Sequence, residues 1–107
     1  MLGKTVTVTV ERPMGSYHPE HKTLYYPINY GYIDGVMGGD GEALDAYIVG
    51  VDCPLTECTG RVIAVIHRKD DCEDKLVVAP EGVTLTREEI LAATHFQERY
   101  FDIEIMM

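Results

Sequence analysis

The feature that most restricts the fold is the division of the chain, by proline and glycine, into short segments of strand character. Residues 5–10 alternate threonine with valine, the period-2 pattern of a strand with one buried face. Pro13 stops this segment, because proline cannot donate to a central ladder. Residues 61–67 are almost continuously apolar, which is typical of a strand buried on both faces. We therefore expect a chain built mainly from short strands.

Further extended segments follow from the same patterns. Residues 25–33 are aromatic and β-branched but contain Pro27 and Gly31, which predicts a bent or bulged strand. Glycine and polar residues predict loops at 14–24 and 34–43. Strands are also expected at 44–51 and 75–79, with a short edge strand at 102–105.

One helix is expected after these strands. Thr86 and Glu89 have the spacing of a capping box, which predicts a helix that begins at Thr86. Its inner face is expected to carry Ile90, Leu91, Thr94, Phe96 and Tyr100. A length of 107 residues allows one compact domain, residues 1–107, and not two. The fold class is therefore mainly β with one C-terminal helix, as a small barrel with the helix packed against it.

Composition excludes several classes of function. The formal net charge is −9, from 18 acids and 9 bases, which argues against a nucleic-acid or membrane-surface partner. No secretory signal and no apolar run of about 18 residues is present, so we expect no membrane span. Three cysteines without an export signal are typical of reduced thiols and of a cytoplasmic protein.

An acidic loop is the first candidate for chemistry. Asp40 and Glu42 are two residues apart and point the same way in an extended segment, and Asp45 starts the next strand. Two unit charges ~4 Å apart repel by about 4 kcal/mol at an effective dielectric of 20, so clustered acids need a cation. Carboxylate oxygens on a tight loop suit Mg²⁺ or Mn²⁺. Taken alone, these acids fit a solvated turn equally well.

A second acidic group precedes Lys75. A charged turn of this kind usually means only solvation. A lysine beside acids is nevertheless a plausible phosphate contact next to a metal cluster. The acids in question are Asp70, Asp71, Glu73 and Asp74.

Two long motifs in the right order resemble the signature of the soluble family I inorganic pyrophosphatases. Tyr26-Pro27-Ile28-Asn29-Tyr30-Gly31-Tyr32-Ile33 resembles the family's Tyr-Pro-Xaa-Asn-Tyr-Gly-Tyr-Ile, and Asp40-Gly41-Glu42-Ala43-Leu44-Asp45 resembles its Asp-Gly-Asp-Pro-Xaa-Asp. Residues 10–13, 75–80 and 95–100 are similar to its entry strand, its lysine-led strand and its C-terminal helix. The similarity covers most of residues 8–104.

The resemblance implies a five-stranded OB-like barrel and Mg²⁺-dependent hydrolysis of pyrophosphate to two phosphates, with Mn²⁺ as another possible cofactor. It implies that Glu42 accepts a proton from the attacking water, that Lys75 and Tyr30 act on the phosphate, and that Glu11 orders the site. Tyr26 and Tyr100 would contact phosphate. The implied metal ligands are Asp40, Glu42, Asp45, one of Asp70 and Asp71, and one of Glu73 and Asp74. Homo-oligomers are common in the family.

The chain also departs from the family pattern. Glu42 stands where the family has aspartate, and the loop between Glu11 and Tyr26 is shorter and lacks the family's cationic phosphate-site residues. The helix's Tyr-Lys pair becomes Tyr100-Phe101, which removes another phosphate-binding cation. Candidate replacements are Arg12, Lys22, His18 and His21.

Two other functions stay open. The shortened loop favours a hydrolase of another phosphorylated small molecule, such as a nucleotide or a phosphate ester. A non-catalytic metal- or phosphate-binding module fits the same acids. An OB-type nucleic-acid binder is disfavoured by charge.

Overall fold

Six strands and one helix make up the part of the chain that the computed structural model describes, residues 1–37, 43–71 and 73–107. The helix α1 spans Arg87–Glu98. The strands are β1 (Thr5–Arg12), β2 (Asn29–Met37), β3 (Ala43–Ile48), β4 (Glu57–Arg68), β5 (Glu73–Ala79) and β6 (Ile103–Met106).

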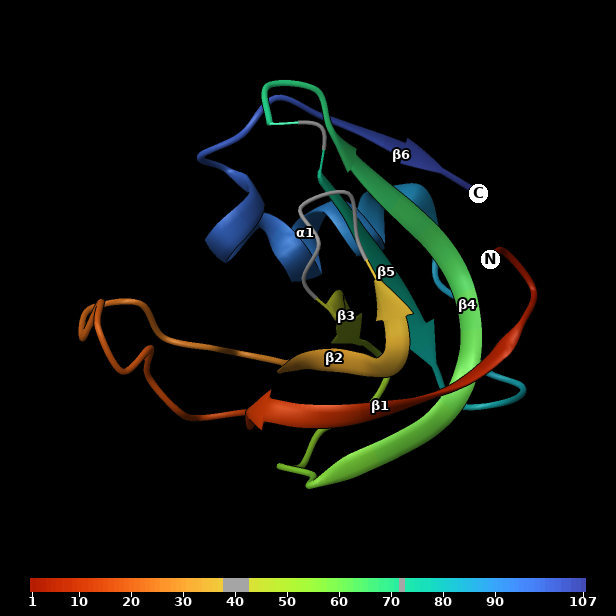
Figure 1. Ribbon diagram of the computed structural model, residues 1–107, viewed down its shortest axis with the longest axis horizontal. Helices are drawn as coiled ribbons and strands as arrows, with labels where there is room; N and C mark the ends of the chain where they lie inside the picture. The colour runs from red at the N-terminus through yellow and green to blue at the C-terminus, as the bar shows by residue number, and fades with distance from the viewer. Residues whose placement is uncertain (38–42, 72) are drawn as a thin grey trace.

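The sheet closes on itself as a five-stranded barrel (Figure 1). The strand order is β1-β2-β3-β5-β4-β6, and β1 also pairs with β4, which closes the ring. Strand β4 is long enough to pair with two strands along one of its edges. Its first half pairs with β1, and its last residues pair with β6. Strands β3 and β5 run parallel, with Ala46 opposite Leu76. The expected barrel with one C-terminal helix is confirmed.

Glycine permits the closest approach of two barrel strands. A Cβ atom built on Gly31 of β2 would lie 1.9 Å from the carbonyl oxygen of Thr9 on β1. No side chain tolerates that distance, so only glycine fits where β1 crosses β2.

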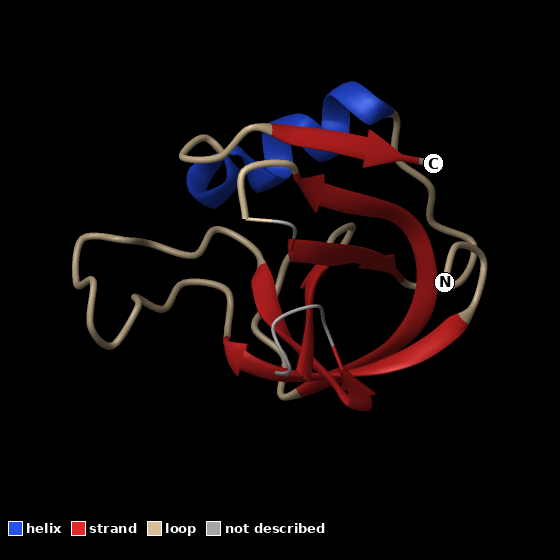
Figure 2. Cartoon of the chain, turned by 45° about the horizontal axis from the view of Figure 1, so that its top comes forward, coloured by secondary structure: helices blue, strands red, loops and turns tan. Residues whose placement is uncertain are grey.

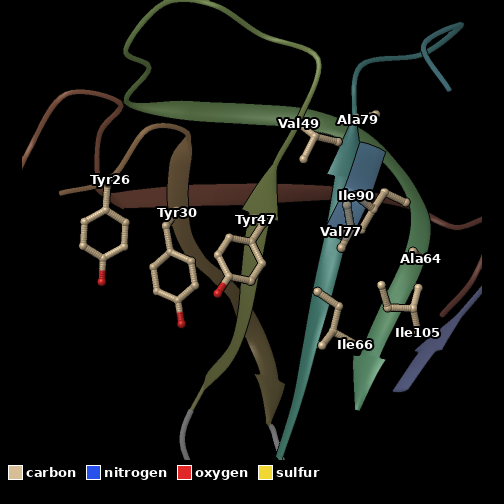
Figure 3. Packing of buried hydrophobic residues seen from close by; sticks show 10 residues of the cluster. All are labelled: Tyr26, Tyr30, Tyr47, Val49, Ala64, Ile66, Val77, Ala79, Ile90 and Ile105. Atoms are coloured by element: carbon tan, nitrogen blue, oxygen red, sulfur yellow. The ribbon is translucent and has the colours of Figure 1, made fainter. Parts of the chain in front are cut away.

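Two hydrophobic clusters lie on opposite faces of the curved sheet. One cluster takes residues from all five barrel strands and fills the interior, including Val8, Ile33, Leu44, Val62 and Leu76. The other lies between the outer face and the helix, and three of its members, Tyr26, Tyr30 and Tyr47, form a row of rings (Figure 3). Neighbouring ring centroids in that row are 5.6 and 4.9 Å apart. The outer face therefore carries a second buried hydrophobic cluster.

Helix α1 begins as the capping box predicts. Thr86 accepts from the Glu89 backbone N–H, and the Glu89 side chain accepts from the Thr86 backbone N–H. Its buried stripe, however, consists of Ile90, Thr94 and Glu98. The expected inner positions Leu91 and Tyr100 are exposed, because Ile90, Thr94 and Glu98 are four apart and share one face. The helix is neither long nor apolar enough to cross a membrane, and the described residues contain no other.

Several element boundaries differ from those expected. Strand β4 begins at Glu57, four residues before the predicted start, because its polar first half pairs with β1. Strand β2 begins only at Asn29, and residues 14–28 form an arm that extends away from the barrel (Figure 2) and returns to it at Tyr26, which packs in the outer cluster. This arm pairs with itself through the bridge between Tyr17 and Tyr25. Both tyrosines are exposed and their rings meet edge to face, with ring centroids 5.3 Å apart.

Candidate functional site

Lys75 is a buried cation at which two acidic segments meet. Its side chain is 3% exposed, and its Nζ donates to Asp45 Oδ2 at 2.7 Å and to Glu73 Oε1 at 2.8 Å. Parallel pairing of β3 with β5 places Asp45 beside Lys75, since their following residues, Ala46 and Leu76, are register partners. Glu73 is two residues before Lys75 on the same strand, so both point to the face that α1 covers.

Tyr30 adds a neutral donor to the same point. Its hydroxyl donates to Asp45 Oδ2 at 2.7 Å, and the residue is buried. Burial, followed by the negative charge of Asp45, raises the pKa of Tyr30 well above its ordinary value. The hydroxyl therefore keeps its proton at neutral pH and serves only as a hydrogen-bond donor to anions.

A second buried cation, Arg68, ends β4 directly opposite Glu73. It is 5% exposed, and it pairs in a fork with Glu98, the last residue of α1. Nε donates to Glu98 Oε1 at 2.9 Å, and one terminal nitrogen donates to Oε2 at 2.6 Å. Burial alone would lower the pKa of Arg68, but the hydrogen bonds and charge of Glu98 raise it above its ordinary value. Arg68 is thus a permanent positive charge.

Buried hydroxyl and amide groups hold Glu98 in place. The Tyr47 hydroxyl donates to Glu98 Oε2 and accepts from Gln97 Nε2 at 2.7 Å. Gln97 Oε1 accepts from the Tyr26 hydroxyl at 2.8 Å. Burial, then the charge of Glu98, raises the pKa of Tyr47. Because each member has a partner, the network fixes both the carboxylate and the guanidinium that it holds.

Glu73 links the two buried cations. Its Oε2 lies 3.5 Å from the remaining terminal nitrogen of Arg68, Nη1, while its Oε1 accepts from Lys75. Asp71 Oδ2 lies 3.8 Å from the same Arg68 nitrogen. The guanidinium carbon also stands 3.7 Å from the centre of the Phe101 ring. Lys75 and Arg68 are therefore separated by a single carboxylate.

A cleft of about 880 Å³ opens beside this cluster, between the 14–28 arm and the C-terminal half of α1. Tyr30 and Arg68 lie at its junction with the ion pairs, and Arg99, Tyr100 and Phe101 line its other side. Its arm side carries His18 and His21, whose ring centroids are 4.8 Å apart. His18 Nδ1 accepts from two backbone N–H groups. Burial, followed by the charge of Arg12, lowers the pKa of His18.

The structure brings together some of the expected site residues. Asp45, Glu73, Lys75 and Tyr30 converge, and Asp71 joins them through Arg68. Asp74 lies on the opposite face of β5 and pairs with His67 at 2.6 Å. Asp70 is exposed and accepts from the backbone of Asp102. Asp40 and Glu42 lie outside the described residues.

The expected substrate-binding residues are more scattered. Tyr100 lines the cleft and accepts from Arg99 at 2.9 Å. Tyr26 is buried, with its hydroxyl committed to Gln97. Glu11 and Lys22 are exposed and do not line the cleft. Arg12 donates to the carbonyl of Glu11 and lies outside the cleft wall.

Sequence reasoning missed the Arg68–Glu98 pair and its support by Tyr47 and Gln97. One signal could have found Glu98: it continues the stripe of Ile90 and Thr94 with a spacing of four. A charged residue on a buried stripe demands a buried partner. Nothing local identifies Arg68 as that partner.

The described residues offer suitable chemistry for a hard divalent cation. Across 1–37, 43–71 and 73–107, no three His, Cys, Asp or Glu side chains gather closely enough to hold a metal by themselves. Two cations, Arg68 and Lys75, nevertheless face four carboxylates, those of Asp45, Asp71, Glu73 and Glu98. This excess of negative charge and the all-oxygen donor set fit Mg²⁺ or Mn²⁺.

Comparison with known proteins identifies a family and related folds. Residues 6–103 match the protein family described as inorganic pyrophosphatase. An inorganic pyrophosphatase of Corynebacterium glutamicum is 34% identical in an alignment of 92 positions, which covers 68% of this chain and 58% of that protein. One from Streptomyces coelicolor is 31% identical in an alignment of 120 positions, gaps included, which covers 92% of this chain and 71% of that protein. This chain thus spans less than two thirds of the C. glutamicum protein.

The fold has solved counterparts. The crystal structure of the inorganic pyrophosphatase from Ehrlichia chaffeensis superposes with a TM-score of 0.74 at 19% identity, over 99% of this chain and 87% of that one. The Thermus thermophilus structure superposes with a TM-score of 0.66 at 17% identity, over 96% and 80%. These superpositions concern the fold, and the family match rests on the sequence. By that match, this chain belongs to the inorganic pyrophosphatase family.

Proposed function

We propose that this chain hydrolyses inorganic pyrophosphate to two phosphates with the help of Mg²⁺ or Mn²⁺. The observation that carries the proposal is the meeting of Asp45 from β3 and Glu73 from β5 at the buried ammonium of Lys75. Relatives that match most of this chain are named inorganic pyrophosphatases, which supports the same substrate.

Asp45 and Glu73, with Asp71 beside them, are the described residues that would hold the metal. The resemblance adds Asp40 and Glu42 to this set as predictions. Bound there, the metal would neutralise charge on the substrate and lower the pKa of a bound water.

The chain's own donors would stabilise the phosphate. Lys75 and Tyr30 both donate to Asp45 Oδ2, so one ammonium and one hydroxyl already point at a single anionic oxygen. A phosphoryl oxygen presents the same chemistry, and donors fixed before the reaction are the effective ones. Glu42 stays the predicted acceptor of the water's proton.

A phosphate-release assay tests the proposal across Mg²⁺, Mn²⁺ and a chelator. We expect metal-dependent release that is lost in Asp45→Asn and sharply reduced in Glu42→Gln. Asp34→Asn, which alters an exposed acid of β2 in the same way, is the matched control and should retain activity. Absence of release above background, or equal activity of Asp45→Asn and Asp34→Asn, would refute hydrolysis at this site.

A second candidate is hydrolysis of a larger phosphorylated small molecule. It is favoured by the cleft of about 880 Å³, whose wall includes the apolar or aromatic residues Leu24, Pro27 and Phe96. A substrate panel of pyrophosphate, nucleotides and phosphate esters separates the two functions by the ratio of kcat/KM. Metal and phosphate binding without turnover on any substrate would instead identify a binding module.

We also infer that residues 1–107 act as one domain and that the protein forms homo-oligomers, as the resemblance to the family implies. The single closed barrel with its packed helix supports the first inference. Sedimentation velocity tests the second, and a purely monomeric species at micromolar concentration would contradict it.

A further inference from the structure

Arg68 is a buried arginine that uses fewer than half of its hydrogen-bond donors. A guanidinium has five N–H donors, and Glu98 accepts from two of them. The third nitrogen, Nη1, has two acids at 3.5 and 3.8 Å, which are ion-pair distances rather than close hydrogen bonds. Among the described residues this nitrogen makes no closer polar contact. It therefore has donors available for a ligand.

Two side chains, Glu98 and Phe101, fix the orientation of this guanidinium. Glu98 at the end of α1 grips one edge, and the Phe101 ring lies against one face at 3.7 Å. Glu98 is 2% exposed and is itself held by Tyr47. An arginine used only to neutralise Glu98 would not need to reach the cleft, yet Arg68 is one of the residues that line it.

The surroundings of Arg68 are those of an anion site. Glu73 bridges it to Lys75, so two buried cations lie on either side of one carboxylate. A phosphate that displaces this shared carboxylate would meet both cations. The planar fork of arginine binds two oxygens of one phosphate, whereas lysine acts as a point charge.

We propose that Arg68 is a substrate-binding residue that takes a phosphate group at the inner end of the cleft. It would supply the positive charge that is missing at Phe101, against which it stacks. The proposal rests on the proposed function for its substrate, and it adds a residue that the family motifs do not include. Glu98 then has the role of a positioning residue that presents Arg68 to the substrate.

Calorimetric titration with inorganic phosphate and with methylenediphosphonate, a pyrophosphate analogue that is not hydrolysed, measures this role without catalysis. We expect Arg68→Met/Glu98→Gln, which removes both buried charges together, to weaken diphosphonate binding about 10- to 100-fold. Arg61→Met is the matched control, because Arg61 is an exposed arginine on the same strand. It should bind as the unaltered protein does.

Arg68→Lys keeps the positive charge and loses the planar fork. It therefore tests the role of Arg68 in phosphate binding even if the double variant does not fold. We expect it to weaken diphosphonate binding several-fold and to raise KM more than it lowers kcat. Unchanged affinity in Arg68→Lys, or in a folded double variant, would overturn the proposal. So would an unaltered protein that binds neither phosphate nor diphosphonate.

The outcomes separate this proposal from the proposed function. If the protein hydrolyses pyrophosphate with metal but the Arg68 variants bind diphosphonate with unchanged affinity, the role of Arg68 is refuted and the proposed hydrolysis is not. If diphosphonate binding depends on Arg68 but no phosphate is released, the role of Arg68 is supported and the proposed hydrolysis is refuted.

Discussion

Two charged side chains in this protein interact strongly with their partners because they are buried. Lys75 and Arg68 are 3% and 5% exposed, and each is paired with carboxylates. A buried charge without a partner costs several kcal/mol, whereas a paired one is close to neutral in its effect on stability. Removing one member of such a pair should therefore lower the free energy of unfolding by more than the intact pair contributes to it.

Lys75→Met tests this sensitivity. Asp45 and Glu73 would lose their shared donor while still partly buried, so we expect the free energy of unfolding to fall by about 1–3 kcal/mol. Lys69→Met, an exposed lysine in the neighbouring turn, should change stability by less than about 0.5 kcal/mol. Urea unfolding measures both. Equal effects of the two substitutions would show that the buried pair does not matter.

Two buried tyrosines are expected to make the folded protein less stable at alkaline pH. Burial raises the pKa of Tyr30 and Tyr47 in the folded protein, so each keeps its proton there while the unfolded chain ionises above about pH 10. The unfolded state then binds fewer protons, and stability falls as pH rises above that value. We expect Tyr30→Phe to lessen this fall, while Tyr25→Phe, at an exposed position, leaves it unchanged. Thermal melts between pH 8 and pH 11 measure the slopes; superimposable curves for Tyr30→Phe and the unaltered protein would contradict the expectation.

At the scale of elements, helix α1 joins the outer face of the barrel to the site. Its start is set by the capping box of Thr86 and Glu89, and its last residue, Glu98, grips Arg68. Twelve residues alone form a marginal helix in water, so the cap and the packing of Ile90 must together hold it. A substitution that weakens the N-terminal cap of α1 should therefore also destabilise its C-terminal end, which lines the cleft.

Thr86→Ala should lower the free energy of unfolding by about 1 kcal/mol, because one backbone N–H at the helix start loses its acceptor. Thr84→Ala, which alters an exposed threonine just outside the helix, is the control and should be nearly neutral. Hydrogen exchange along residues 87–98 gives the site-resolved readout. Unchanged exchange in the first helical turn would exclude a role for the cap.

At the scale of the whole molecule, charge dominates the solution behaviour. The formal net charge is −9, and this total includes the four carboxylates and two cations that gather at the site. Mutual repulsion of this kind opposes the compact state, and a cation that binds only the folded form offsets it.

Mg²⁺ should therefore raise the melting temperature more than NaCl of the same ionic strength does. A ligand at about 100 times its dissociation constant stabilises by about 2.7 kcal/mol, and about 1 kcal/mol shifts the melting temperature of a domain near this size by about 4 °C, so the shift should be about 10 °C. Asp45→Asn should reduce the shift, and Asp34→Asn should not. Identical shifts from Mg²⁺ and NaCl would mean that only general screening acts.

The barrel itself follows from patterns that are visible within a few residues. The alternation in residues 5–10, the apolar run of 61–67 and the capping box at Thr86 each predict an element that the structure contains. Such patterns are readable because strand and helix periodicity is a local property of the chain. The boundary of β4 was less readable, because its polar first half is a strand only through pairing with β1.

The sequence by itself determined the elements, their order and the residue types available for phosphate chemistry. Only the tertiary structure decided which charges meet. Asp45 reaches Lys75 through the parallel pairing of β3 with β5, and Arg68 reaches Glu98 through the packing of α1, each across 30 residues of chain. Strand parity also separated Glu73 from its neighbour Asp74, sending one to the helix side and the other to His67. These pairings are set by strand register and helix docking, which are non-local, so no short motif encodes them.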